Sequence, residues 1–126
     1  MRWGSMDNKN VLIVDDEVIN FYLLDNLIDP IHTVLVATNG KDALIRAEKC
    51  VPDLILLDLA LPDMHGVTVC QHLKENPQTK YIPIIIVSAS DPNQYGKTMK
   101  ALGVTEFFVK PFDSYAVKQK ISDYLT

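Results

Sequence analysis

The sequence predicts an α/β domain with a doubly wound, five-stranded parallel sheet that carries five helices on its two faces. Two observations lead to this prediction: five short apolar runs recur along the chain, and segments with helical spacing of apolar residues separate or follow them. Runs that are apolar without alternation are typical of strands covered on both faces, as in parallel sheets. Strands that alternate with helices favour a layered architecture, in which right-handed crossovers place helices on both sides of the sheet.

The longest apolar runs have about four or five residues, which is a length typical of buried strands. In chain order they occupy residues 11–14, 34–36, 54–57, 84–87 and 107–109. Each run is followed by a segment that could form a helix, so the order of elements is strand and helix in regular alternation.

Helical spacing identifies the five helices in turn. Leu23, Leu24 and Leu27 share one face of the first helix, which Asp29-Pro30 is expected to end. The segment 93–101 predicts a fourth helix with a thin apolar face. The apolar faces of the second, third and last helices are formed by Ala43, Leu44 and Ala47, by Val69, Cys70 and Leu73, and by Val117, Ile121 and Leu125. The third helix should start near Gly66, and Asp113 or Ser114 is placed to cap the last.

Length and composition indicate one globular domain. The chain has 126 residues, of which 48% are hydrophobic and 22% are charged. No apolar run approaches the roughly 18 to 20 residues of a membrane helix, so we expect no membrane segment. The formal net charge of -4 argues against direct nucleic-acid contact by this domain. Cys50 and Cys70 have no metal-ligand or redox spacing and no secretory signal opens the chain, so we expect a cytoplasmic protein with reduced thiols.

The first five residues, MRWGS, are expected to be a remnant of a cloning vector, because a Gly-Ser pair precedes a second methionine, Met6. No internal repeat or linker-like stretch follows. We therefore expect one domain over residues 6–126.

Polar side chains follow four of the five apolar runs. Asp15-Asp16 come directly after the first run, Asp58 after the third, Ser88 after the fourth and Lys110-Pro111 after the fifth. Ligands of such sheets bind beyond the carboxyl ends of the strands, so these groups should meet at one edge. The sequence therefore predicts a site made of three carboxylates, a hydroxyl and an ammonium group.

Three neighbouring carboxylates repel one another, and a hard divalent cation resolves that repulsion. Mg²⁺ prefers oxygen ligands and is usually held by one or two carboxylates together with phosphate oxygens. Lys110 would balance charge on the opposite side of a phosphoryl group, and Ser88 could donate a hydrogen bond to it. Each residue alone has a commoner structural explanation, such as a helix cap or a turn. Their coincidence at the strand ends favours a Mg²⁺ site that receives a phosphoryl group.

Four stretches resemble the response-regulator receiver domains of two-component signalling. They are residues 11–17 (VLIVDDE), 52–66 (PDLILLDLALPDMHG), 82–89 (IPIIIVSA) and 107–112 (FFVKPF). The resemblance extends from Lys9 to about Leu125. It implies a fold like that of the chemotaxis regulators, with the flavodoxin-like strand order 2-1-3-4-5.

The resemblance also implies the chemistry of the site. Asp58 would be the phosphoacceptor, taking a phosphoryl group from a sensor histidine kinase or a phosphotransfer protein. Asp16, Asp58 and the backbone carbonyl of Ala60 would bind Mg²⁺, and Asp15 would act mainly through a metal-bound water. Lys110 would contact Asp58 at rest and the phosphoryl oxygens afterwards, and its bond to Pro111 would be cis.

Two further residues would transmit the signal. Ser88 would move toward the phosphoryl group, and Phe107 would turn into the space that Ser88 vacates. This movement would reshape the face formed by the fourth helix, the last strand and the last helix, which would control an output domain, a partner protein or a phosphorylation-dependent homodimer. Phe107 has an alternative interpretation as an ordinary core residue of the last strand. Many relatives have a tyrosine at this position.

On this interpretation the protein is a switch that modifies itself rather than an enzyme with turnover. Two alternatives remain open. One is a degenerate receiver that serves only for docking or dimerisation, although the complete set of polar residues argues against it. The other is a Mg²⁺-dependent phosphohydrolase with an aspartate nucleophile. Such haloacid-dehalogenase-like enzymes place a second aspartate two residues after the nucleophile, where this chain has Ala60.

Overall fold

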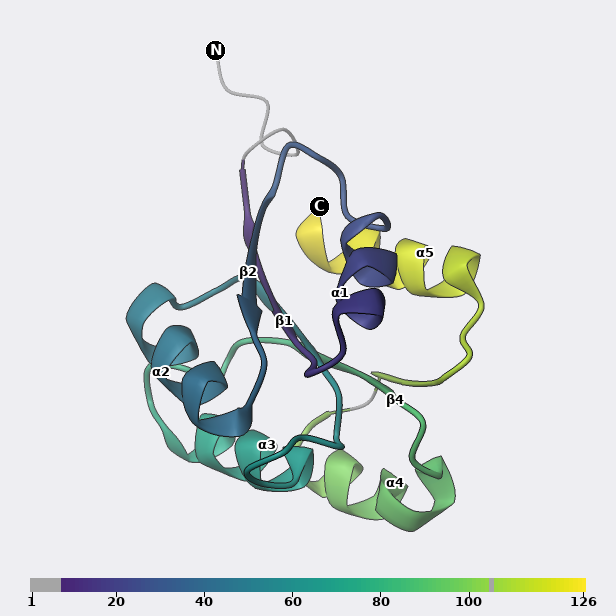
Figure 1. Ribbon diagram of the computed structural model, residues 1–126. Helices are drawn as coiled ribbons and strands as arrows, with labels where there is room; N and C mark the ends of the chain where they lie inside the picture. The colour runs from purple at the N-terminus through teal and green to yellow at the C-terminus, as the bar shows by residue number, and fades with distance from the viewer. Residues whose placement is uncertain (1–7, 105) are drawn as a thin grey trace.

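The fold is known from a computed structural model, which describes residues 8–104 and 106–126. The expected vector remnant, residues 1–5, lies outside the described residues. A central sheet of five parallel strands lies between two layers of helices (Figure 1). The strands are arranged in the order β2-β1-β3-β4-β5, so the predicted doubly wound sheet and its order are confirmed.

The strands coincide with the apolar runs of the sequence. Their bounds are β1 (Asn10–Val14), β2 (Thr33–Ala37), β3 (Leu54–Leu57), β4 (Ile84–Ser88) and β5 (Glu106–Val109). Every neighbouring pair is parallel, with Val14 of β1 beside Leu57 of β3. The carboxyl ends of all five strands therefore lie at the same edge of the sheet.

The helices alternate with the strands as predicted. Their bounds are α1 (Val18–Asp25), α2 (Gly40–Cys50), α3 (Gly66–Glu75), α4 (Pro92–Ala101) and α5 (Ser114–Leu125). Helices α2, α3 and α4 cover one face of the sheet, and α1 and α5 cover the other (Figure 1). Asp113 caps α5, since its carboxylate accepts hydrogen bonds from the amides of Tyr115 and Ala116. No helix among the described residues is long and apolar enough to cross a membrane.

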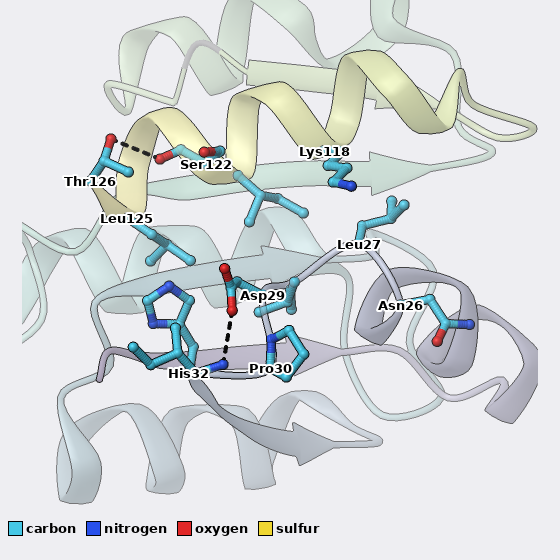
Figure 2. Close-up of a pocket in the computed structure, with 12 residues that line it drawn as sticks. Asn26, Leu27, Asp29, Pro30, His32, Lys118, Ser122, Leu125 and Thr126 are labelled. Carbon is cyan, nitrogen blue, oxygen red and sulfur yellow. Dashed lines mark hydrogen bonds between the residues drawn. The ribbon is translucent and has the colours of Figure 1, made fainter. Parts of the chain in front are cut away.

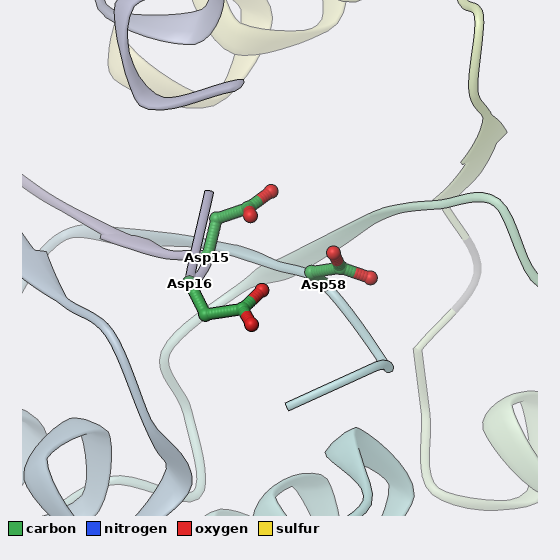
Figure 3. A group of neighbouring side chains, drawn as sticks. All are labelled: Asp15, Asp16 and Asp58. Carbon is green, nitrogen blue, oxygen red and sulfur yellow. The ribbon is translucent and has the colours of Figure 1, made fainter. Parts of the chain in front are cut away.

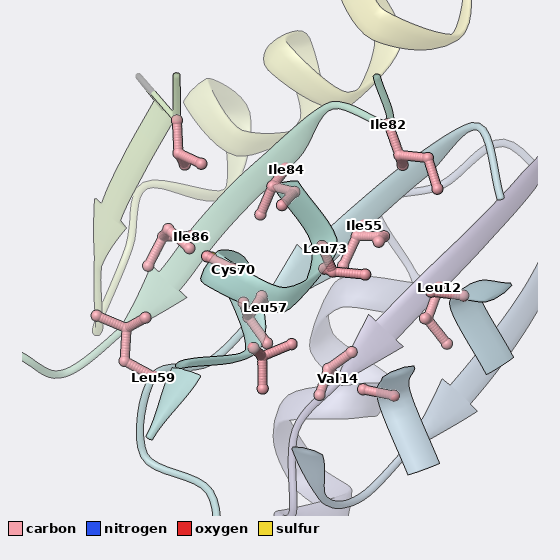
Figure 4. Close-up of a cluster of buried hydrophobic side chains, with 14 of the residues drawn as sticks. Leu12, Val14, Ile55, Leu57, Leu59, Cys70, Leu73, Ile82, Ile84 and Ile86 are labelled. Carbon is pink, nitrogen blue, oxygen red and sulfur yellow. The ribbon is translucent and has the colours of Figure 1, made fainter. Parts of the chain in front are cut away.

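The core consists of two apolar clusters, one on each face of the sheet. Successive side chains of a strand point to opposite faces, so Leu12 and Val14 pack beneath α2 and α3, whereas Val11 and Ile13 pack beneath α1 and α5. Figure 4 shows the first cluster, in which Cys70 and other side chains of α3 meet the strands. Burial on both faces explains why the strand sequences are continuously apolar.

The first helix ends earlier than predicted, since Asp29-Pro30 was expected to end it. Helix α1 ends at Asp25, and the amides of Leu27 and Ile28 bond to carbonyls three residues earlier, those of Leu24 and Asp25. Such bonds tighten the chain into a turn. The helix therefore ends five residues before Pro30, the proline that was expected to end it.

The predicted apolar face of this helix is also partly wrong. Leu23 is 48% exposed, whereas Leu24 is buried and Phe21 is partly buried against the core. Leu27 lies beyond the end of α1 and is partly buried against the same cluster. Residues 21 and 24 are about one helical turn apart and share a face, and Leu23 lies roughly 100° away from Leu24 around the axis. Helix α4 has the thin apolar face that was predicted. Of its ten residues, all of which the structure describes, Met99 alone is buried.

Candidate functional site

Three carboxylates meet at the carboxyl ends of β1 and β3. Asp15 and Asp16 follow β1 and Asp58 follows β3, its neighbour in the sheet. The amide of Asp58 donates to the carbonyl of Val14 at 2.9 Å, which continues the ladder beyond the strands. One oxygen of each carboxylate lies within 4.8 Å of the others (Figure 3). The predicted convergence of the three aspartates is present in the structure.

The three aspartates differ in burial and in their hydrogen bonds. Asp15 and Asp58 are 2% and 5% exposed, whereas Asp16 is exposed to solvent. Oδ1 of Asp15 accepts from the amide of Glu17 at 2.9 Å, and Oδ1 of Asp58 accepts from the amide of Ala60 at 3.1 Å. Buried charges require such partners. The cluster therefore has two fixed carboxylates and one that solvent can reach.

Lys110 supplies the opposite charge. Its Nζ lies 2.7 Å from Oδ2 of Asp15 and 3.0 Å from Oδ2 of Asp58, so one ammonium bridges both buried carboxylates. Burial alone would lower the pKa of Lys110. The hydrogen bonds and charges of the two aspartates outweigh that effect and hold the pKa above its ordinary value. The backbone amide of Lys110 donates to the carbonyl of Ser88, and the Lys110–Pro111 peptide bond is cis.

The charge balance of the cluster suits a hard cation. Three carboxylates face one ammonium, so negative charge remains in excess, and the exposed Asp16 opens the cluster to solvent. Oxygen ligands of this kind, with room for water, are those that Mg²⁺ prefers. The donor set therefore fits the ion that the sequence predicts.

The two predicted signalling residues lie in the neighbouring strands β4 and β5, where Ser88 is the last residue of β4 and Phe107 is the second residue of β5. Ser88 is fully buried, and its Oγ lies 3.2 Å from Oγ of Ser90. No hydrogen bond in the described part of the chain joins the Ser88 hydroxyl to an aspartate or to Lys110. Phe107 is half-buried and packs against the cluster beneath α2, α3 and α4. This packing agrees with the alternative interpretation, in which Phe107 is an ordinary core residue of the last strand.

The loop between β3 and α3 contains contacts that the sequence did not predict. Asp63 accepts hydrogen bonds from the amides of Gly40 and Lys41 at the start of α2, at 2.7 and 2.9 Å. These bonds hold the pKa of Asp63 below its usual value. His65 caps α3 and lies with its ring centroid 4.8 Å from that of Tyr95 in α4. In each of these contacts the two partners are more than twenty residues apart in sequence. Local spacing therefore could not predict the contacts.

A pocket of about 350 Å³ lies at the opposite end of the sheet (Figure 2). It is lined by residues 26–32, which precede β2, and by side chains of α5 from Lys118 to Leu125. The acidic cluster follows β1 and β3 at the carboxyl ends of the strands. This pocket is therefore separate from the predicted site.

Comparison with known proteins gives consistent matches over nearly the whole chain. A family model described as "Response regulator receiver domain" matches residues 11–122. Response regulator PleD of Caulobacter vibrioides is 39% identical over 109 residues, which are 84% of this chain and 24% of PleD. Protein PilH of Pseudomonas aeruginosa is 31% identical over 116 residues, which are 91% of this chain and 96% of PilH.

Solved structures agree with these matches. The chemotaxis response regulator CheY4 of Vibrio cholerae has a TM-score of 0.82 and 27% sequence identity, over 93% of this chain and 98% of that chain. The chain thus spans nearly the whole of PilH and CheY4 but only about a quarter of PleD.

Proposed function

Since the chain belongs to the response regulator receiver domain family, we propose that its Asp58 accepts a phosphoryl group from a phosphohistidine in a Mg²⁺-dependent reaction. Phosphorylation and Mg²⁺ dependence are general to this family. The observation that carries the assignment to Asp58 is its place within the cluster. Among the three aspartates of the cluster, Asp58 alone contacts both the Lys110 ammonium and the amide of Ala60.

The geometry of the site suits phosphoryl transfer. An oxygen of Asp58 attacks phosphorus, the bond from phosphorus to the histidine nitrogen breaks, and an acyl phosphate remains on the protein. Such a transfer mainly requires positioning and neutralisation of charge. The Lys110 ammonium, already 3.0 Å from Asp58, is in place to neutralise phosphoryl oxygens.

The chain also offers a set of ligands for the metal. Asp16, Asp58 and the backbone carbonyl of Ala60 would hold Mg²⁺, with Asp15 beside them. When bound, the ion would supply positive charge that offsets the carboxylates and the incoming phosphoryl group. Lys110 pairs with both Asp15 and Asp58, which orients the two carboxylates toward the same point.

The phosphodonor is a sensor histidine kinase or a phosphotransfer protein, the partners of receiver domains in general. Helix α1 supports a docking surface for it. Val18, Ile19 and Tyr22 are 66%, 62% and 58% exposed, and α1 begins two residues after Asp16. An exposed apolar patch beside a polar site marks a protein interface. We assign contact with the donor to this face of α1.

The output is assigned to the face formed by α4, β5 and α5. Phe107 of β5 is half-buried and Tyr115 of α5 is exposed, so movement at β5 would alter this surface. The partner is an output domain, a separate protein or a second copy of the chain. The domain is assigned to residues 6–126 and to the cytoplasm, and the free thiols of Cys50 and Cys70 support that location.

Receiver domains are in general signalling modules rather than enzymes, and we assign this chain the same role. The alternative of a phosphohydrolase needs a general acid two residues after the nucleophile. Ala60 occupies that position and offers no titratable group. The alternative of a docking module leaves the Lys110-bridged cluster without a role.

Incubation with acetyl phosphate and Mg²⁺ tests the proposal. We expect intact-protein mass spectrometry to show one gain of about 80 Da, the mass of one HPO₃ group. The gain should require Mg²⁺ and should fall sharply in Asp16→Asn, whereas Asp123→Asn, an exposed aspartate of α5, should behave as wild type. No gain in the wild type would favour the docking module. Release of many equivalents of phosphate from added phosphate esters would favour the hydrolase.

The Ser88→Ala variant should accept phosphate and signal poorly, because the nucleophile and Lys110 remain while the sensing hydroxyl is lost. A hydrogen bond to a charged group is worth about 1.5 to 3 kcal/mol, which changes a population ratio about ten- to hundredfold. With beryllofluoride bound as a phosphoryl mimic, amide shifts should reach Phe107 and α5 in the wild type and stay near Asp58 in the variant. Ser90→Ala, which removes the hydroxyl that Ser88 contacts but keeps the Ser88 hydroxyl itself, is the matched control. Equal distant shifts in wild type and Ser88→Ala would exclude Ser88 as the relay.

A further inference from the structure

The loop from Leu59 to His65 has two anchors, and Ala60 belongs to the first of them, where it pairs with His65 in an isolated antiparallel bridge. The first anchor is at the base of the loop, where the amide of Gly66 donates to the carbonyl of Leu59 at 2.8 Å. A side chain at Gly66 would not fit, since its Cβ would lie 2.6 Å from Cα of the buried Leu59. The base of the loop is therefore held by close backbone packing that needs no polar side chain.

The second anchor is at the tip of the loop. The two oxygens of Asp63 each accept one amide, from Gly40 at 2.7 Å and from Lys41 at 2.9 Å. These are the first two amides of α2. The third amide, that of Asp42, donates to the side-chain oxygen of Asn39. The first amides of a helix have no partner within it and attract negative charge. One side chain of the loop thus satisfies donors that α2 leaves open.

The approach of the loop to α2 is close. A Cβ on Gly40 would lie 2.3 Å from Cγ of Met64, so Met64 occupies the space beside Gly40 that a side chain would fill. Met64 is partly buried against the core, whereas Asp63 itself is exposed. In the described part of the chain, the hydrogen bonds of Asp63 are the polar link between this tip and α2.

We propose that Asp63 is a positioning residue for the acidic site. By fixing the tip of the loop to α2, it holds the backbone of Ala60 in the orientation that the proposed metal site requires. Ala60 is exposed, and its amide donates to Oδ1 of Asp58, so a displaced loop would disturb both its carbonyl and the nucleophile. Groups that orient metal ligands from outside the coordination shell commonly change metal affinity when removed. The role rests on the proposed function, since it concerns the same Mg²⁺ site.

Mg²⁺ titration of the wild type and of Asp63→Ala, followed by amide NMR, tests this role without any phosphodonor. We expect the affinity to fall about tenfold in the variant, the lower end of the effect of such outer groups. Hydrogen exchange at the amides of Gly40 and Lys41 should accelerate in the same variant. Asp63→Asn removes the same charge but retains one acceptor oxygen. Its Mg²⁺ affinity should therefore lie between that of the wild type and that of Asp63→Ala.

Asp53→Ala is the matched control. Asp53 is also exposed and accepts a backbone amide, that of Asn10 at 2.8 Å, but it precedes β3 at the other end of the sheet. Its Mg²⁺ affinity should equal that of the wild type. The loss in Asp63→Ala should also persist at high salt, where a simple charge effect is screened.

The outcomes separate this inference from the proposed function. Wild-type affinity in Asp63→Ala, or a loss that salt abolishes or that Asp53→Ala shares, would overturn the positioning role and leave the Mg²⁺ site intact. A wild-type protein that shows no response to millimolar Mg²⁺ would overturn the proposed function and this role together.

Discussion

The Asp58→Asn variant is expected to take up no phosphoryl group while its fold remains intact. An amide is not a nucleophile toward phosphorus, whereas a carboxylate is. The neighbouring Asp15 and Asp16 are not expected to substitute, because neither receives both the Lys110 ammonium and the Ala60 amide that orient Asp58. The expected effect is complete loss of modification.

The stability of Asp58→Asn should equal or exceed that of the wild type. The variant relieves repulsion among three carboxylates, and Lys110 keeps its 2.7 Å contact with Asp15. Mass spectrometry after treatment with acetyl phosphate and Mg²⁺ measures the modification, and urea unfolding measures the stability. A full gain of about 80 Da in the variant would contradict the assignment of the phosphoacceptor.

The Lys110→Met variant is expected to be strongly destabilised in the absence of divalent cations. It leaves two buried carboxylates, Asp15 and Asp58, without their shared ammonium. Breaking a buried ion pair by removing one partner costs about 3 to 5 kcal/mol. We expect about 3 kcal/mol of lost unfolding free energy, because 15% of the Lys110 side chain is exposed and water screens part of the charge.

Lys120→Met is the control for this effect. Lys120 also pairs with a carboxylate, that of Glu106 at 3.6 Å, but its side chain is 36% exposed. Exposed pairs contribute less than about 1 kcal/mol, so the control should lose little stability in urea unfolding. Equal losses in the two variants would show that the cluster is not held by Lys110.

The effect of Lys110 should also depend on pH in a defined direction. The pKa of Lys110 is raised from 10.5 in the folded protein, so its charge stabilises the fold fully below that pH. The contribution is lost as the pH rises through the raised pKa. The difference in stability between wild type and Lys110→Met should therefore be large at neutral pH and shrink above pH 10.5.

The fold and the main part of the site could be predicted because their signals are local in sequence. Continuous apolar runs follow from burial on both faces, and the residue after each run marks a strand end. Asp15, Asp58 and Lys110 meet because parallel strands bring their ends to one edge. The position of the cluster can therefore be predicted from where these residues follow the apolar runs of the sequence.

The remaining features depend on distant partners or on competition between similar residues. The bonds of Asp63 to the start of α2 arise only after the chain folds. The choice between Leu23 and Leu24 for the apolar face of α1 depends on how the helix sits on the sheet. The hydroxyl of Ser88 pairs with Ser90 rather than the cluster, which no pattern of residue types indicates.

The single buried residue of α4 has an energetic consequence. Elements with few buried contacts open locally at a free energy well below that of global unfolding. Met99 holds this helix to the core, and the ring of Tyr95 contacts that of His65, the N-cap of α3. Displacement of α4 therefore need not disrupt the strands, and native-state hydrogen exchange would measure it as a local opening with a lower free energy than global unfolding. A small chemical change at one side chain can shift such an equilibrium because the opposing free energy is small.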